Sequence, residues 1–138
     1  MTIRLSDIDH IGIAVEDLEA SVELYRRTLG VEPEHRERVQ DQGVEEVLFP
    51  VGSSFIQLLG ALEPDTPVGR WLASRGPGVH HVAYRVPDLV AALDRLRAEG
   101  VRLIDEVPRP GSRGTMIAFV HPKAMAGVLV ELVQVTEV

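Results

Sequence analysis

Hydrophobic and polar residues follow two different periods in the first half of the chain. Residues 8–15 alternate with a period of two, which predicts a strand with one buried face. A helix is expected to begin at Asp17 and to end at Gly30, because the apolar side chains between them recur every three or four positions. Extended segments are then predicted at 33–40, 44–50 and 54–60.

The second half repeats this order of elements. A helix is predicted to begin at Pro87–Asp88 and to close at Gly100, with apolar residues again spaced by three and four. Extended segments are expected at 101–106, 115–121 and 127–135. The arginine- and glycine-rich stretch at 109–114 is predicted to be a loop that a ligand could order.

Each half is therefore interpreted as one βαβββ module. The modules span about 7–60 and 79–136, and together they form a single α+β domain over residues 1–138. The linker at 61–78 contains three prolines around a short helical candidate near 68–75. Two modules with the same order of elements suggest a duplication.

The composition narrows the class of protein. A chain of 138 residues with 45% hydrophobic residues can bury a substantial core. The net charge of -7 argues against general nucleic-acid binding, which requires a basic face. We expect no membrane span and a cytoplasmic protein, because no segment is apolar and long enough and the N-terminus lacks a secretory signal pattern. Without cysteine, any metal must be held by nitrogen and oxygen ligands.

Four residues with ligand chemistry occupy matching places in the two halves. The segment around His10 aligns with the segment around His81 at an offset of 71, and the segment around Gln57 aligns with that around Glu131 at an offset of 74. Gln57 and Glu131 stand among apolar neighbours, where a polar group is costly unless it is paired. One imidazole and one oxygen ligand from each half therefore predict a metal site.

Each of these residues also has a plainer interpretation on its own. A single histidine in a strand is more often a hydrogen-bonded core or surface residue than a metal ligand, and a buried glutamine can bond to a neighbouring backbone group. The four residues together at duplicated positions favour the metal site. His80 and His121 are expected to lie outside it, because His80 faces away from His81 in the same strand and His121 has no counterpart in the first half.

Three further segments carry a family resemblance, namely Asp41–Glu46, Val79–Val86 and His121–Leu132. With the ligand order His, Gln, His, Glu, they make nearly the whole chain similar to the vicinal oxygen chelate (glyoxalase-fold) superfamily, and within it to the methylmalonyl-CoA epimerase family. The resemblance implies two tandem βαβββ modules that form a cupped mixed sheet around a metal site. It also implies one divalent metal ion per chain. Co²⁺ is favoured, and Mn²⁺, Ni²⁺, Zn²⁺ or Fe²⁺ is possible.

The resemblance further implies an activity and its partners. Members of this family interconvert (2R)- and (2S)-methylmalonyl-CoA by removing and returning the C2 proton through a metal-stabilised enolate. The expected partner is therefore a small-molecule acyl-CoA substrate, and the expected assembly is a homodimer. His10, Gln57, His81 and Glu131 match the metal ligands of the family.

Two glutamates are the candidate bases on opposite faces of the substrate. Glu46 matches the position of a catalytic glutamate in the bacterial epimerases, and strand alternation sets it apart from Glu45, which points the other way. Glu131 would be both a metal ligand and a base. Contacts to CoA are assigned to residues near the turn-rich loop, namely Ser112, Arg113 and Lys123.

Other functions of the same fold stay open. A lactoylglutathione lyase commonly carries a carboxylate where this chain has the amide Gln57, and this difference argues against a lyase. An extradiol dioxygenase uses two histidines and one carboxylate on iron, so a fourth ligand at Gln57 argues against a dioxygenase. A metal-free small-molecule binding protein is the non-enzymatic alternative. Retention of all four ligand types argues against that alternative.

Overall fold

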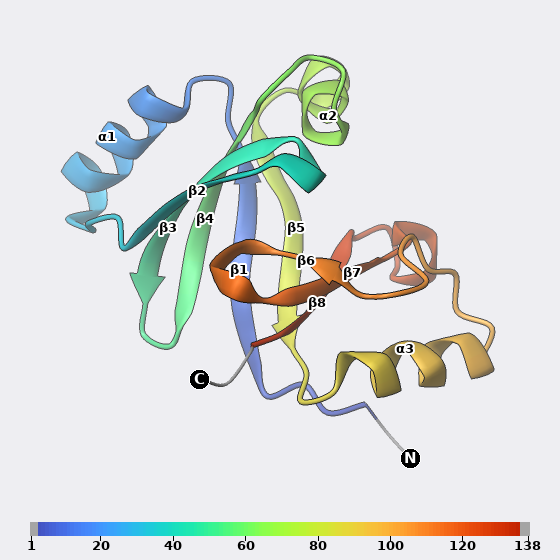
Figure 1. Cartoon of the computed structure of the whole chain (residues 1–138). Helices are drawn as coiled ribbons and strands as arrows, with labels where there is room; N and C mark the ends of the chain where they lie inside the picture. The colour runs from blue at the N-terminus through green and yellow to red at the C-terminus, as the bar shows by residue number, and fades with distance from the viewer. Residues whose placement is uncertain (1–2, 136–138) are drawn as a thin grey trace. The chain divides into compact units, whose positions relative to one another are not determined.

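The computed structural model describes residues 3–135, and its element order is βαβββ repeated twice with a helix between the repeats (Figure 1). The first repeat contains β1 (Asp7–Ala14), α1 (Leu18–Leu29), β2 (His35–Val39), β3 (Val44–Val51) and β4 (Ser54–Ala61). The linker contains α2 (Pro67–Arg75). The second repeat contains β5 (Gly78–Arg85), α3 (Leu89–Ala98), β6 (Arg109–Pro110), β7 (Met116–Val120) and β8 (Val130–Gln134). The predicted α+β fold is confirmed.

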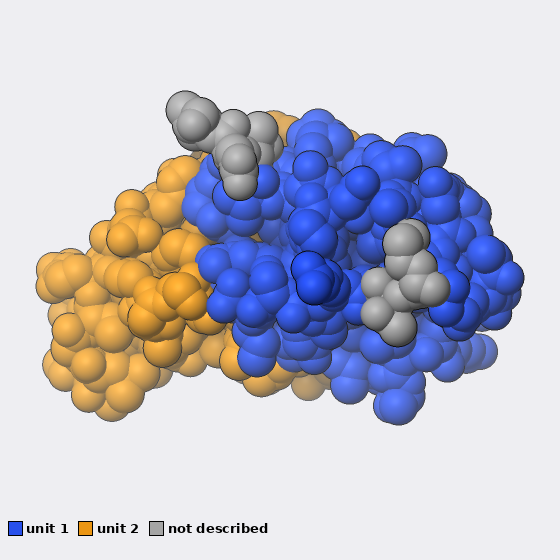
Figure 2. All heavy atoms as spheres, turned by 90° about the horizontal axis from the view of Figure 1, so that it is seen from below, with its two compact units in different colours: residues 1–10, 81–138 blue, residues 11–80 orange. Residues whose placement is uncertain are grey.

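The described residues form two compact units, which Figure 2 shows in different colours. Unit 1 consists of the described parts of residues 1–10 and 81–138, and unit 2 consists of residues 11–80. In unit 2 the strand order is β2-β3-β4-β1, with β2, β3 and β4 antiparallel. In unit 1 the order is β1-β5-β8-β7-β6, in which β5 and β8 are parallel and β8, β7 and β6 are antiparallel. Strands β1 and β5 therefore contribute residues to both units, and the sheet is mixed.

The local sequence sets the ends of the two long helices. The Asp17 carboxylate accepts a hydrogen bond from the amide of Ala20 at 3.0 Å, and Asp88 caps α3 in the same way. Gly30 ends α1 with a φ of 68°, a left-handed conformation that glycine adopts without a steric penalty. These helix boundaries agree with the sequence predictions. Among the described helices, none is both long and apolar enough to cross a membrane.

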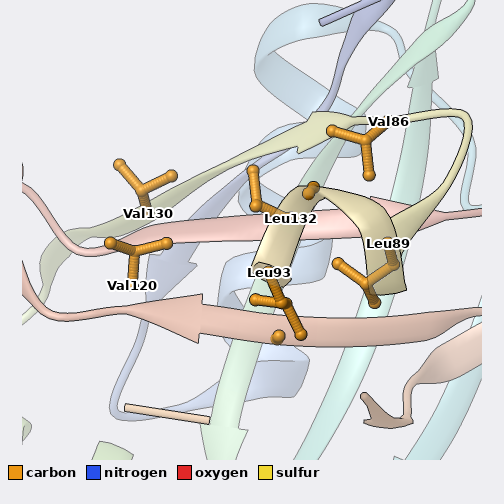
Figure 3. Packing of buried hydrophobic residues seen from close by; sticks show 8 residues of the cluster. Val86, Leu89, Leu93, Val120, Val130 and Leu132 are labelled. Carbon is orange, nitrogen blue, oxygen red and sulfur yellow. The ribbon is translucent and has the colours of Figure 1, made fainter. Parts of the chain in front are cut away.

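The core of unit 1 lies between α3 and one face of β7 and β8 (Figure 3). Aliphatic side chains fill it, as the low aromatic content requires: Val86, Leu89, Ala92, Leu93, Ala118, Val120, Val130 and Leu132. Side chains alternate across a strand, so the opposite face of β8 presents Glu131 and Val133. That opposite face carries the buried Glu131 beside a second apolar cluster, which consists of Ala83, Ile117, Phe119 and Val133.

Unit 2 uses both faces of β4. Leu58 packs with residues of α1, whereas its neighbour Leu59 packs with Val68 of α2. Adjacent residues of a strand point to opposite faces, so the two helices cover opposite sides of β4. Glu46 is the ladder partner of Leu59 and therefore lies on the α2 side.

One predicted strand is wrong in position. Residues 101–106 were expected to be extended, but they make only an isolated bridge at Leu103, and the second strand of this module is the two-residue β6. The backbone of this segment bonds to β7 only around the bridge, where Ile104 donates to the Phe119 carbonyl at 3.0 Å. The amide of Phe119 in turn donates to the carboxylate of Asp105 at 2.8 Å, so a side chain accepts where a backbone carbonyl would continue the ladder. The prolines at 108 and 110 have no N–H to extend a ladder.

We predict that Leu93→Ala lowers the free energy of unfolding by about 2–5 kcal/mol, because it leaves a cavity at a site that is 1% exposed. Val90→Ala on the same helix is the matched control. Val90 is 56% exposed, so its truncation should change stability by less than about 0.5 kcal/mol. Urea unfolding followed by circular dichroism measures both. Equal losses for the two variants would contradict the assignment of this core.

Candidate metal centre

Three predicted metal ligands of unit 1 meet in a buried cluster. Nε2 of His10 lies 3.0 Å from Nε2 of His81 and 2.9 Å from Oε1 of Glu131. The third side of the triangle, from His81 Nε2 to Glu131 Oε1, is 3.3 Å. All three side chains are buried, with 3% to 6% exposed. These residues form a group that could hold a metal ion.

Strand register places these side chains on one face. In the parallel pair of β5 and β8, Ala83 is the partner of Glu131, so Glu131 and Ala83 share a face. His81 precedes Ala83 by two residues and points to the same side. Phe119 is the partner of Glu131 on the other flank, and its ring meets the His81 ring edge-on at 5.6 Å between centroids. The cluster therefore has an apolar wall.

The donor triangle fits a first-row divalent cation. Ligands at right angles around an ion with bonds of about 2.1 Å are about 3.0 Å apart, close to the three separations observed here. Glu131 Oε1 is buried and, among the described residues, has no aligned hydrogen-bond partner, although it is near both imidazoles. Two imidazoles and one carboxylate suit Co²⁺, Zn²⁺, Fe²⁺, Mn²⁺ or Ni²⁺. The residues present therefore fit the metal that the family resemblance implies.

Asp9 holds the His10 ring on the side away from the other two ligands, and the sequence did not point to this role. Its carboxylate is fully buried and accepts the Nδ1 proton of His10 at 2.7 Å, which leaves Nε2 of His10 to face the other two ligands. Arg85 and Arg113 each donate to the same carboxylate at 2.7 Å. The only sequence signal for this role is that Asp9 directly precedes His10. A carboxylate that orients a histidine ligand in this way also increases its basicity.

The charges of the cluster shift its protonation equilibria. Burial favours neutral His10, but the charge of Glu131 and the hydrogen bond to Asp9 outweigh it and raise the pKa of His10 to about 9. Burial also opposes ionised Asp9, yet His10 and Arg85 lower the pKa of Asp9 to about 2. Burial opposes ionised Glu131 as well, and His10 followed by His81 lowers the pKa of Glu131 well below its ordinary value. The shifts of His10 and Glu131 share one cause, the attraction between the imidazole and the carboxylate.

The remaining predicted residues of the site, Glu46 and Gln57, lie together in unit 2. Both are buried, with Glu46 1% and Gln57 6% exposed. Nε2 of Gln57 donates to Oε2 of Glu46. Oε1 of each side chain is buried and has no hydrogen-bond partner among the described residues. The side-chain oxygen of Gln57, the atom through which an amide can bind a cation, therefore has no partner among the described residues.

The three candidate CoA contacts belong to two short helical turns of unit 1. Arg113 lies in the turn Ser112–Gly114 with a φ of 55°, and its guanidinium is directed to Asp9. Lys123 lies in the turn Pro122–Ala124, where its amide donates to Nδ1 of His121. Ser112 accepts through its carbonyl from Thr115. A CoA role for these residues stays a prediction.

The two histidines that were expected to lie outside the site have other neighbours. His80 meets the ring of Trp71 edge-on at 5.2 Å between centroids. His121 begins the turn that holds Lys123. Neither residue belongs to the groups of described residues that could hold a metal ion.

Comparison with known proteins agrees with this fold. A model of the Glyoxalase/Bleomycin resistance protein/Dioxygenase superfamily matches residues 9–119. The ethylmalonyl-CoA/methylmalonyl-CoA epimerase of Cereibacter sphaeroides is 38% identical over 130 residues, which cover 93% of this chain and 97% of that protein.

Two solved structures of relatives superimpose closely on this chain. A variant of the Streptomyces coelicolor methylmalonyl-CoA epimerase in complex with 2-nitronate-propionyl-CoA has a TM-score of 0.94 at 45% identity, with 98% of each chain covered. A methylmalonyl-CoA epimerase in complex with methylmalonyl-CoA and NH4+ gives the same TM-score of 0.94 at 45% identity, again with 98% of each chain covered. The predicted glyoxalase-like fold is therefore confirmed.

We predict that Asp9→Asn weakens divalent-metal affinity by about 10- to 100-fold, because the amide is a poorer acceptor for the His10 Nδ1 proton. Asp7→Asn on the same strand is the control. Its carboxylate is half exposed and lies 3.8 Å from Arg85, whereas the Nδ1 of His10 bonds to Asp9. Titration calorimetry with Co²⁺ on both folded variants tests the prediction. Unchanged affinity in Asp9→Asn would remove Asp9 from the support of the centre.

Proposed function

Because the chain belongs to the Glyoxalase/Bleomycin resistance protein/Dioxygenase superfamily, we propose that it is a metal-dependent epimerase that interconverts (2R)- and (2S)-methylmalonyl-CoA. The observation that carries the proposal is the buried donor triangle of His10, His81 and Glu131. The names of the relatives supply the substrate class. An acyl-CoA thioester is accordingly the small molecule that this protein takes.

The proposed ligand set is His10, Gln57, His81 and Glu131, with one divalent ion per chain and Co²⁺ as the favoured metal. Gln57 is supported by its buried and unpaired Oε1, because an amide oxygen in apolar surroundings is costly unless it is paired. When bound, such a cation would act as a Lewis acid that lowers the energy of the enolate by several kcal/mol. Asp9 holds the His10 ring in the orientation that ligation needs.

The side chains must then move one proton between the two faces of C2. A group on one face removes the proton, and a second group on the other face returns one, so two acid–base residues are required. We assign these roles to Glu46 and Glu131. Glu46 retains one unpaired carboxylate oxygen, and the amide of Gln57 orients the other oxygen. Glu131 would ligate through one oxygen and accept the proton on the other.

The wider assignments are also proposals. Ser112, Arg113 and Lys123 are candidates for contacts to CoA. The chain would act as a cytoplasmic homodimer in which each subunit is one domain of two βαβββ modules, about 7–60 and 79–136, joined by the linker 61–78. If the protein does not act on methylmalonyl-CoA, the alternative functions are those of a lactoylglutathione lyase, an extradiol dioxygenase or a metal-free binding protein.

We expect metal-dependent loss of the C2 proton signal when methylmalonyl-CoA is incubated with this protein in deuterated water, followed by proton NMR. Interconversion of the two epimers should accompany the exchange, because both steps pass through the same enolate. Excess chelator should return the rate to that of the buffer control. A folded, metal-loaded sample without exchange would overturn the proposed function.

We predict that Glu46→Gln lowers epimerase turnover by about 10²- to 10⁴-fold, the contribution of one positioned acid–base group. Glu45→Gln is the matched control. Glu45 is the adjacent residue on β3, faces the opposite side and pairs with Arg36 at 2.8 Å, so its loss should leave turnover within about twofold. Full turnover of Glu46→Gln with both epimers would remove Glu46 from the mechanism.

A further inference from the structure

A second group of ligand side chains lies on strands β2 and β3 of unit 2. One donor atom each of His35, Glu37 and Glu46 lies within 4.8 Å of the other two. Nε2 of His35 is 2.8 Å from Oε1 of Glu37. This cluster shares no residue with the donor triangle of His10, His81 and Glu131.

Strand register explains the grouping. Glu37 is the antiparallel partner of Glu46, so their side chains stand side by side on one face. His35 lies two residues before Glu37 and therefore points to the same face. The exposed fractions are 32% for the side chain of His35 and 35% for that of Glu37, whereas Glu46 is 1% exposed. The group thus has two members that solvent reaches and one buried member.

Glu46, the buried member of this group, gives a separate indication that a ligand binds here. Oε1 of Glu46 has no hydrogen-bond partner among the described residues, although a buried carboxylate oxygen is costly to leave unpaired. The Gln57 amide that binds Oε2 is neutral, so it supplies a donor but no compensating charge. A cation beside His35 and Glu37 would supply a positive charge and a bonding partner for the unpaired oxygen of Glu46.

We propose that His35, Glu37 and Glu46 form a second divalent-cation site that takes Zn²⁺ and, by engaging Glu46, inhibits epimerisation. The inhibitory consequence rests on the proposed function of Glu46, whereas zinc binding does not. Occupation of this site would withdraw the Glu46 carboxylate from the substrate proton. The site would thereby make the enzyme sensitive to excess metal.

The donor set favours zinc among common cations. Imidazole nitrogen with two carboxylate oxygens suits Zn²⁺, whereas Mg²⁺ and Ca²⁺ prefer oxygen ligands alone. In a tetrahedral zinc site with bonds of about 2.1 Å, donors lie about 3.4 Å apart, so the 2.8 Å contact between His35 and Glu37 needs only a small opening. Three protein ligands leave the fourth position to water on the exposed side of the group.

Native mass spectrometry with increasing Zn²⁺ tests the site without reference to activity. The wild-type chain should take up two zinc ions. His35→Ala should take up one, and Glu37→Gln should bind the second ion at least tenfold more weakly. Glu45→Gln, on the opposite face of the same strand pair, should still bind two. His81→Ala should lose the other ion and keep the one at His35.

Turnover at one and at two zinc equivalents tests the inhibition. The second equivalent should lower the wild-type rate at least tenfold and should leave His35→Ala unaffected. A wild-type chain that binds one ion only, or a His35→Ala variant that still binds two, would overturn the second site. A second ion bound through His35 without loss of rate would overturn the inhibition. If a chain loaded with Co²⁺ does not turn over methylmalonyl-CoA either, the proposed function fails, while the zinc count still decides the second site.

Discussion

The buried carboxylate of Asp9 is the charge on which the arrangement of the donor triangle depends. It is fully buried and is held by three donors, from His10, Arg85 and Arg113. An ion in such a place is tolerated only when its partners compensate for lost hydration. Through His10, this one carboxylate sets which imidazole nitrogen meets His81 and Glu131. A residue outside the donor triangle therefore fixes the orientation of one of its three members.

The same division between faces recurs in both units. In unit 1, Leu132 packs under α3, while the adjacent Glu131 points to the donor triangle. In unit 2, Val47 belongs to the core beneath α1, while the adjacent Glu46 faces Gln57. A strand exposes successive side chains to opposite faces, so one strand can serve the core and the chemistry together. Each core packs against one face of a strand, and the opposite face of the same strand holds a buried polar group.

Glu46 stands between two sets of partners in unit 2. On one side it accepts a hydrogen bond from Gln57, and on the other it lies beside His35 and Glu37. A general base needs a free carboxylate oxygen, and such an oxygen is also an attractive ligand for a cation. The free oxygen that would suit Glu46 to the proposed proton transfer would thus also suit it to the proposed binding of zinc.

Periodicity in the sequence predicted most of the elements, and duplication pointed to the residues that form the donor triangle. The N-caps Asp17 and Asp88 could be identified because capping depends only on neighbouring residues. His10 and His81 could be aligned because each occupies the same position in the first strand of its module. Asp9 and Arg113 could not be paired from the sequence, since they lie 104 residues apart and only folding brings them together. The strand predicted at 101–106 is reduced to one bridge at Leu103, because the side chain of Asp105, which no local pattern reveals as an acceptor, takes the amide of Phe119. Capping and side-chain periodicity act within a few residues, so the sequence by itself determined most of the elements and the candidate ligand types. Only the tertiary structure decided which distant residues hold the candidate ligands in place, because those contacts join segments that lie far apart in the chain.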